Sequence, residues 1–243
     1  RVGDRLVVST CAEIVSTLNG GSQVLNINRL FDGAGTLVGY GPRPGCGSLV
    51  RQLDDLASAS RGRSVFLIEE GAYSGGTIRF VLRQLHERGV EVSTLVLGFC
   101  TPKTRDYIKE VFDGEIIVMN EIGELVDWIT DHDLIPFTPG CGRMLEEKTP
   151  EGCVCAFPYI LPFGRMEEWT SLPKDIAREV SKFCLEASIG FFDGFSKSNG
   201  TALTIRDLVD SYPAVPIPAG SGEIPSLDVE VVGFLRAVRG RLI

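Results

Sequence analysis

Two adjacent carboxylates stand directly before a turn of small residues in the middle of the chain. Glu69 and Glu70 are followed by Gly71, Ala72, Tyr73, Ser74, Gly75, Gly76 and Thr77. Paired carboxylates accept hydrogen bonds from the vicinal hydroxyls of a ribose, or hold a Mg²⁺ ion that bridges such hydroxyls. Backbone N–H groups and the hydroxyls of Ser74 and Thr77 suit a phosphate where a helix begins. These residue types predict a site for a phosphorylated sugar.

The surrounding sequence predicts the elements that such a site needs. Residues 65–68 form a short apolar run typical of a buried strand, and apolar residues then recur at helical spacing until Gly89. Alternating strands and helices predict an α/β fold, with a parallel sheet and helices on both faces, and a ligand at the carboxyl ends of its strands. Further strands are expected at 6–9, 24–30, 92–99 and 115–119, and further helices at 13–18, from Thr101 to Gly114, and at 121–129.

The remaining sequence divides into a loop and a C-terminal region. Residues 31–47 hold six glycines and two prolines and predict a long loop, a feature that is usually functional or mobile. Beyond Asp133 the alternation of strands and helices stops and prolines become frequent, which indicates an appendage, and three segments of it predict helices, so we expect it to be mostly helical. The expected domains are therefore 1–135, the α/β domain, and 136–243, a hood, substrate-recognition or interaction region. Helices are expected in the appendage at 172–189, 204–212 and 226–239.

The thirteen residues 65–77 resemble the binding motif for phosphoribosyl pyrophosphate (PRPP) of the type I phosphoribosyltransferases. In that family the two acids contact the ribose hydroxyls and the last five residues hold the 5′-phosphate. The resemblance implies a Mg²⁺-dependent glycosyltransferase of nucleotide metabolism, in which a base or amine displaces pyrophosphate from PRPP. It covers about residues 6–135 in the order of elements, and the residues themselves match only at 65–77.

Two departures from the family motif bear on the substrate. Glutamates at 69 and 70 reach further than the aspartates that many members carry. Tyr73 stands where some purine enzymes have an aspartate near the base nitrogen, and a tyrosine is a poor proton acceptor at neutral pH. The resemblance therefore leaves the acceptor unidentified and speaks against a 6-oxopurine.

The resemblance also implies roles for residues outside the motif. A pyrophosphate-binding loop would lie at Thr10, Cys11 and Ala12, and residues 31–47 would form the mobile catalytic loop. Arg29 and Arg43 would contact anions, Arg43 acting with Glu69 and Glu70 at the reacting centre; surface charge is the competing interpretation for both arginines. Phe137 would stack on a base, although a core phenylalanine is the more common explanation.

Composition limits the remaining function classes. The 243 residues carry a net charge of −8, which argues against binding to duplex nucleic acid, and no run approaches the roughly 18 apolar residues of a membrane span. Seven scattered cysteines, an odd number without a CxxC pair, indicate reduced thiols in a cytoplasmic protein and no structural zinc site. The expected partners are therefore small molecules, with a homodimer left open.

Two other hypotheses compete with the transferase. The first is a non-catalytic sensor that uses the same fold to detect PRPP or a nucleotide. The second makes the appendage a docking or dimerisation module. A serine hydrolase is not expected because no GxSxG sequence is present, and Pro42 and Pro44 interrupt the one near match to a dinucleotide-binding fingerprint.

Overall fold

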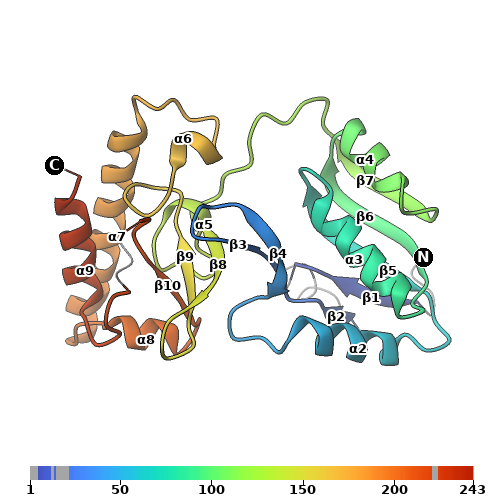
Figure 1. Ribbon diagram of the computed structural model, residues 1–243, viewed down its shortest axis with the longest axis horizontal. Coiled ribbons are helices and arrows are strands. Elements are labelled where there is room, and N and C mark those ends of the chain that lie inside the picture. The colour runs from blue at the N-terminus through green and yellow to red at the C-terminus, as the bar shows by residue number, and fades with distance from the viewer. Residues whose placement is uncertain (1–4, 12–13, 15–21, 221–223, 243) are drawn as a thin grey trace. The chain divides into compact units, whose positions relative to one another are not determined.

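A computed structural model describes residues 5–11, 14, 22–220 and 224–242 and divides the chain into two compact units (Figure 1). The first unit comprises Arg1–Asn28, Tyr40–Pro42 and Cys46–Val126, and the second comprises Arg29–Gly39, Arg43–Gly45 and Asp127–Ile243. This division departs from the expected boundary at 135/136. Strand β3 explains the difference, because it pairs with β8, more than a hundred residues later in the chain.

The first unit is built on a parallel sheet. Its strands lie in the order β2-β1-β5-β6-β7, and each pair of neighbours runs parallel. The sheet confirms the expected α/β class, since parallel strands require crossover connections between them. The strands are β1 (Leu6–Ser9), β2 (Ser22–Val24), β5 (Val65–Ala72), β6 (Val92–Cys100) and β7 (Glu115–Glu121).

Three helices cover one face of this sheet. Helices α2 (Leu49–Ala59), α3 (Gly76–Glu87) and α4 (Pro102–Lys109) share one hydrophobic core with alternate residues of the central strands, among them Leu67 and Leu95. Helix α2 was not expected from the sequence. Thr101 caps α4 by accepting a hydrogen bond from the Thr104 N–H at 3.1 Å, as the Thr-Pro pair predicts.

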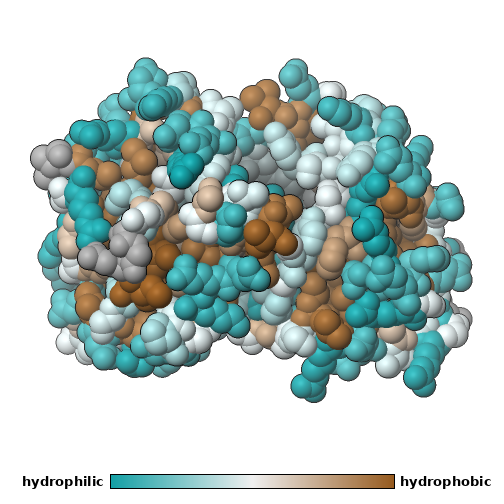
Figure 2. All heavy atoms as spheres, in the orientation of Figure 1, coloured by the Kyte–Doolittle hydropathy of each residue, from teal (hydrophilic) through white to brown (hydrophobic). Residues whose placement is uncertain are grey.

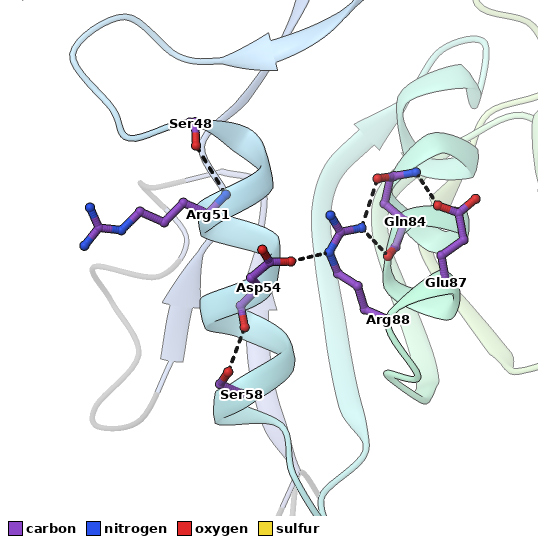
Figure 3. Close-up of polar contacts among 7 residues, drawn as sticks. All are labelled: Ser48, Arg51, Asp54, Ser58, Gln84, Glu87 and Arg88. Carbon is purple, nitrogen blue, oxygen red and sulfur yellow. Dashed lines mark hydrogen bonds and ion pairs between the residues drawn. The ribbon is translucent and has the colours of Figure 1, made fainter.

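Arg88, at the end of α3, joins α2 to α3 (Figure 3). Its Nε lies 2.8 Å from the Asp54 carboxylate of α2, and its Nη1 donates to both oxygens of Gln84, each at 3.0 Å. The side chain of Arg88 is only 19% exposed, so these contacts satisfy a charge that is largely removed from water. By contrast, the ion pair between Arg51 and Asp55 is fully exposed to solvent.

One helix expected in the first 135 residues is wrong, and another is not tested. Residues 122–130 are irregular instead of forming a helix over 121–129. The Asp127 carboxylate accepts hydrogen bonds from the backbone N–H groups of its neighbour Trp128 and of the distant Ser171, and the bond from Trp128 competes locally with helix formation. The helix expected at 13–18 lies mostly outside the described residues.

The expected loop at 31–47 contains a β-hairpin. Strands β3 (Ile27–Phe31) and β4 (Leu37–Pro42) flank a tight turn in which Asp32 Oδ1 accepts from the N–H groups of Ala34 at 2.9 Å and Thr36 at 2.8 Å. Gly35 supplies the positive φ of that turn. The glycines of residues 31–47 lie in this turn, in β4 and in the segment after it. The expected long loop is therefore not observed.

The second unit combines a five-stranded mixed sheet, which was not expected, with helices from the expected appendage. Its strand order is β10-β9-β8-β3-β4, and β8 and β9 are antiparallel. The polar composition of β8 and the prolines near β9 and β10 concealed these short strands from sequence patterning. The elements are α5 (Asp131–Leu134), β8 (Arg143–Lys148), β9 (Val154–Phe157), α6 (Met166–Trp169), α7 (Ala177–Asn199), α8 (Ile205–Val209), β10 (Ala214–Pro216) and α9 (Val231–Gly240).

Helices α7, α8 and α9 confirm the three helices expected in this region, with shifted ends. Helix α7 begins five residues later than expected because 173–176 form a turn in which the Ile176 N–H donates to the Pro173 carbonyl. It continues to Asn199 and ends at Gly200, which has a positive φ. Helices α7 and α9 pack together over a core that includes Leu185 and Leu235.

Apolar side chains also reach the surface of both units (Figure 2). Among them are Met119 in β7 and Phe183 and Phe191 in α7, which are 73%, 72% and 67% exposed. Among the described residues no helix combines the length and apolar character that crossing a membrane requires.

The contacts of Arg88 predict a difference in stability between two arginine variants. We expect Arg88→Ala to lower the free energy of unfolding by about 1–2 kcal/mol, because it leaves Asp54 and Gln84 without their shared cation. Arg51→Ala, which removes an exposed i,i+4 pair, should change it by less than about 0.5 kcal/mol. Urea unfolding measures both, and equal losses in the two variants would contradict the role assigned to Arg88.

Candidate functional site

The carboxyl ends of β1 and β5 form the natural ligand position of the first unit. In the order β2-β1-β5-β6-β7 the direction in which strands are added reverses between β1 and β5. Ligands of open α/β sheets bind at such a reversal, outside the carboxyl ends of the strands. Ser9 pairs with Ile68, and the Thr10 N–H donates to the Ile68 carbonyl at 3.3 Å. Thr10 and Glu69 therefore lie at the same edge of the sheet.

The two acids occupy different environments on β5. The strand extends through Ala72, four residues beyond the expected end, because Gly71 and Ala72 continue to pair with Phe99 and Cys100 of β6. Successive side chains of a strand point to opposite faces. Glu69 is accordingly half-buried, with its Oε2 atom shielded from solvent, and Glu70 is exposed. The fold therefore shields the Glu69 carboxylate in part from solvent, whereas the Glu70 carboxylate is open to a ligand.

The turn from Tyr73 to Gly75 leads directly into α3. Gly75 has a φ of 75° and stands at the N-cap position, where it offers no capping side chain. The first amides of a helix lack partners within the helix and carry the positive end of its dipole. Ser74 Oγ lies 3.5 Å from the Gly76 N–H, and Tyr73 and Ser74 are exposed. This arrangement can bind an anion through backbone N–H groups and a hydroxyl.

Helix α4 supports the turn from behind. The Thr104 hydroxyl donates to the Tyr73 carbonyl at 2.6 Å. A Cβ atom at Gly75 would lie 3.2 Å from Ile108 and 3.3 Å from Thr104, so the turn and α4 are in close contact. This contact holds the exposed atoms of the turn in one geometry.

Tyr40 and Thr104 are site residues that sequence reasoning missed. The Tyr40 ring stacks on Phe80 of α3 at 4.3 Å, and its hydroxyl lies 3.2 Å from the position of a Cβ on Gly76. The hydroxyl is therefore beside the first residue of α3. A lone tyrosine in a Gly-rich segment gave no sequence signal for this position, because the hairpin that carries it was expected to be a loop.

The expected pyrophosphate loop is only partly described. Ala12 lies outside the described residues. The Thr10 N–H donates to Ile68, and the Cys11 N–H donates to Ser9 Oγ at 3.0 Å. Both amides are thus used within the protein in this arrangement, and a pyrophosphate would have to replace the Ser9 hydroxyl to bind Cys11.

The remaining candidate residues belong to the second unit. Arg29, Arg43 and Phe137 fall within the segments assigned to that unit, whereas Glu69, Glu70 and the turn fall within the first. The Arg29 guanidinium lies 5.7 Å from the Phe31 ring centre, and Arg43 is half-buried between β4 and α2. These three residues therefore belong to a different compact unit from the acid pair and the turn.

Two carboxylates in sequence fit a magnesium ion that shares its ligands with a substrate. Mg²⁺ keeps several waters and is usually held by one or two carboxylates together with substrate phosphates. Among the described residues no group of three or more His, Cys, Asp or Glu side chains could hold a metal ion by itself. The exposed Glu70 suits an ion that arrives with a phosphorylated ligand, whereas the Glu69 side chain points to the opposite face of β5.

Comparison with known proteins does not assign a family. No family model matches the chain, and no curated protein or solved structure shows a significant match to it. The functional argument therefore depends on the geometry and on the residues of the site.

Substitution of two adjacent glycines of the turn by alanine should change the free energy of unfolding by different amounts. Gly75→Ala forces a left-handed φ on alanine and should lower the free energy of unfolding by about 1–2 kcal/mol. Gly76→Ala meets only the hydroxyl ends of Tyr40 and Ser74, at 3.2 and 3.6 Å, and should change the free energy of unfolding by less than about 0.5 kcal/mol. Chemical denaturation of both variants measures the difference, and an equal effect would show that the turn does not hold Gly75 in this conformation.

Asp133 in the second unit predicts a pH dependence of stability. Burial raises the pKa of Asp133, opposed by hydrogen bonds from the Thr130 N–H at 3.0 Å and hydroxyl at 3.3 Å and by the charge of Arg29. A raised pKa favours the protonated form in the folded protein, so its stabilising contribution is full below about pH 4 and is lost as pH rises through the raised value. Asp133→Asn removes this dependence. Relative to that variant, the wild type should lose unfolding free energy between pH 4 and pH 7, and a constant difference would contradict the assignment.

Proposed function

We propose that the chain binds PRPP and transfers its phosphoribosyl group to a nitrogenous acceptor with release of pyrophosphate, in a Mg²⁺-dependent reaction. The observation that carries this proposal is the position of the acid pair and the anion-binding turn. The acid pair lies on β5, beside the reversal point of a parallel sheet, and the turn connects the end of β5 to the N-terminus of α3. The resemblance of 65–77 to the PRPP motif agrees with this geometry.

The proposed binding uses three groups of the first unit. The amides of Gly76 and Thr77 and the Ser74 hydroxyl hold the 5′-phosphate, assisted by the dipole of α3. The exposed Glu70 accepts hydrogen bonds from the ribose hydroxyls, and the half-buried Glu69 limits where the ring lies. Bound Mg²⁺ would lower the negative charge on the leaving pyrophosphate.

The reaction needs little proton chemistry from the protein. The bond from the anomeric carbon to the pyrophosphate oxygen breaks, and its electron pair leaves with pyrophosphate. A bond forms from that carbon to the acceptor nitrogen, which passes its proton to solvent. Positioning of the sugar and stabilisation of developing charge are therefore the main contributions of the chain.

Substitution of the exposed acid provides the test of PRPP binding. We expect Glu70→Gln to weaken PRPP binding about 10–100-fold, because hydrogen bonds to a charged group contribute about 1.5–3 kcal/mol. Isothermal titration of PRPP with Mg²⁺ measures this loss. Glu87→Gln, at the opposite end of α3 and exposed, is the matched control and should bind within about twofold of the wild type. Absence of binding by the wild type would overturn the proposal.

A second measurement separates transfer from sensing. Pyrophosphate release is followed with PRPP and a panel of nitrogenous bases and amines. Release with an acceptor supports the transferase. PRPP binding that depends on Glu70 but gives no release across the panel would instead indicate the sensor, which uses the same binding site.

A further inference from the structure

The second unit contains a cavity of about 520 Å³ that the proposed function does not use. Its walls come from α7, α8, the strands β9 and β10, and the segment after α5. The volume lies in the range of sites that bind small molecules, which are typically apolar pockets of about 300–1,000 Å³. All of its lining residues belong to this one unit.

Two hydroxyls of the cavity wall already donate hydrogen bonds within the protein. The Thr138 hydroxyl donates to the Ile135 carbonyl at 2.7 Å, and the Ser188 hydroxyl donates to the Cys184 carbonyl at 2.8 Å. Burial raises the pKa of Cys141 to about 12, so this thiol is neutral. The wall therefore offers van der Waals contact and few hydrogen bonds, which favours an apolar ligand.

Two phenylalanines of the wall occupy unfavourable states. Phe137 has a φ of 69°, which costs a residue with a side chain about 1–2 kcal/mol. Its ring packs edge-on against Phe192, with ring centres 6.2 Å apart. Phe191 lines the cavity and is 67% exposed. Backbone strain of this kind concentrates at binding sites, and a ligand that covers Phe191 would remove its apolar ring from water.

The charge around the cavity opposes an anion. Asp131 and Asp207 contribute to its lining, and none of the described lining residues is a lysine or arginine. The hydrogen bond from the Thr204 hydroxyl lowers the pKa of Asp207, which is therefore ionised at neutral pH. A negatively charged ligand would meet two carboxylates and, among the described lining residues, no lysine or arginine.

We propose that this cavity binds an uncharged small molecule that carries an aromatic ring. The ring packs against Phe137 and Phe191, where aromatic pairs favour edge-on or offset contact. This site is independent of PRPP binding, so either proposal can fail without the other.

Two fluorescent probes that differ in one group test the proposal. N-phenyl-1-naphthylamine is neutral, and 1-anilinonaphthalene-8-sulfonate adds a sulfonate to the same ring system. We expect saturable binding of the neutral probe, at least about tenfold tighter than binding of the anion. Equal or tighter binding of the sulfonate, or no saturable binding of the neutral probe, would overturn the proposal.

A pair of variants on α7 tests the location. Ala187 lines the cavity and is exposed, so Ala187→Phe should fill the cavity without disturbing the core and should weaken the neutral probe at least about tenfold. Ser198→Phe adds the same ring to an exposed position eleven residues along the helix, about 16 Å away, and should leave binding unchanged. Circular dichroism and urea unfolding check that both variants fold. Unchanged binding by a folded Ala187→Phe would overturn the proposal.

The carboxylate at the edge of the cavity gives an independent readout. Asp131→Asn removes one negative charge from an exposed position and should strengthen binding of the sulfonate relative to the neutral probe. If the ratio of the two affinities does not change, the charge argument for an uncharged ligand is wrong.

Discussion

The close approach of β5 and β6 at Glu70 is the constraint on which the candidate site depends. A Cβ atom on Gly98 of β6 would lie 2.2 Å from the Glu70 carbonyl oxygen, and one on Gly71 would lie 2.5 Å from the Phe99 ring. Glycine at both positions lets the strands pair as far as Ala72 and Cys100. This pairing brings the turn onto α4, where the Thr104 hydroxyl holds it. The two glycines therefore determine how far β5 and β6 pair and, through this pairing, where the turn lies.

Sequence patterning predicted the part of the fold in which local signals agree with tertiary packing. The apolar run at 65–68, the helical spacing after it and the Thr-Pro cap at 101 all appear as β5, α3 and α4. The hairpin β3–β4 was missed because its strand pairing depends on β8, far along the chain. The helix expected at 121–129 is absent for a local reason. The Asp127 carboxylate accepts a hydrogen bond from the neighbouring backbone amide of Trp128, and the spacing of apolar residues does not predict such a bond.

The site was predictable to a similar extent. Glu69, Glu70 and the turn could be found because their residue types and order carry a chemical signal. Tyr40 could not, because its position beside Gly76 arises from stacking on Phe80. The apolar cavity also lacked a sequence signal, because the residues that line it have the same composition as a core.

The chain passes from the first unit to the second at residue 29 and returns before α2, so the units are not consecutive in the sequence. Strand β3 leaves the ribosome more than a hundred residues ahead of β8, its parallel partner. Until β8 is synthesised, an edge of the nascent hairpin stays without its final hydrogen bonds, a state that invites pairing with other chains. Truncation after the first unit would make that state permanent, which limits how this protein can be divided during evolution or by proteolysis.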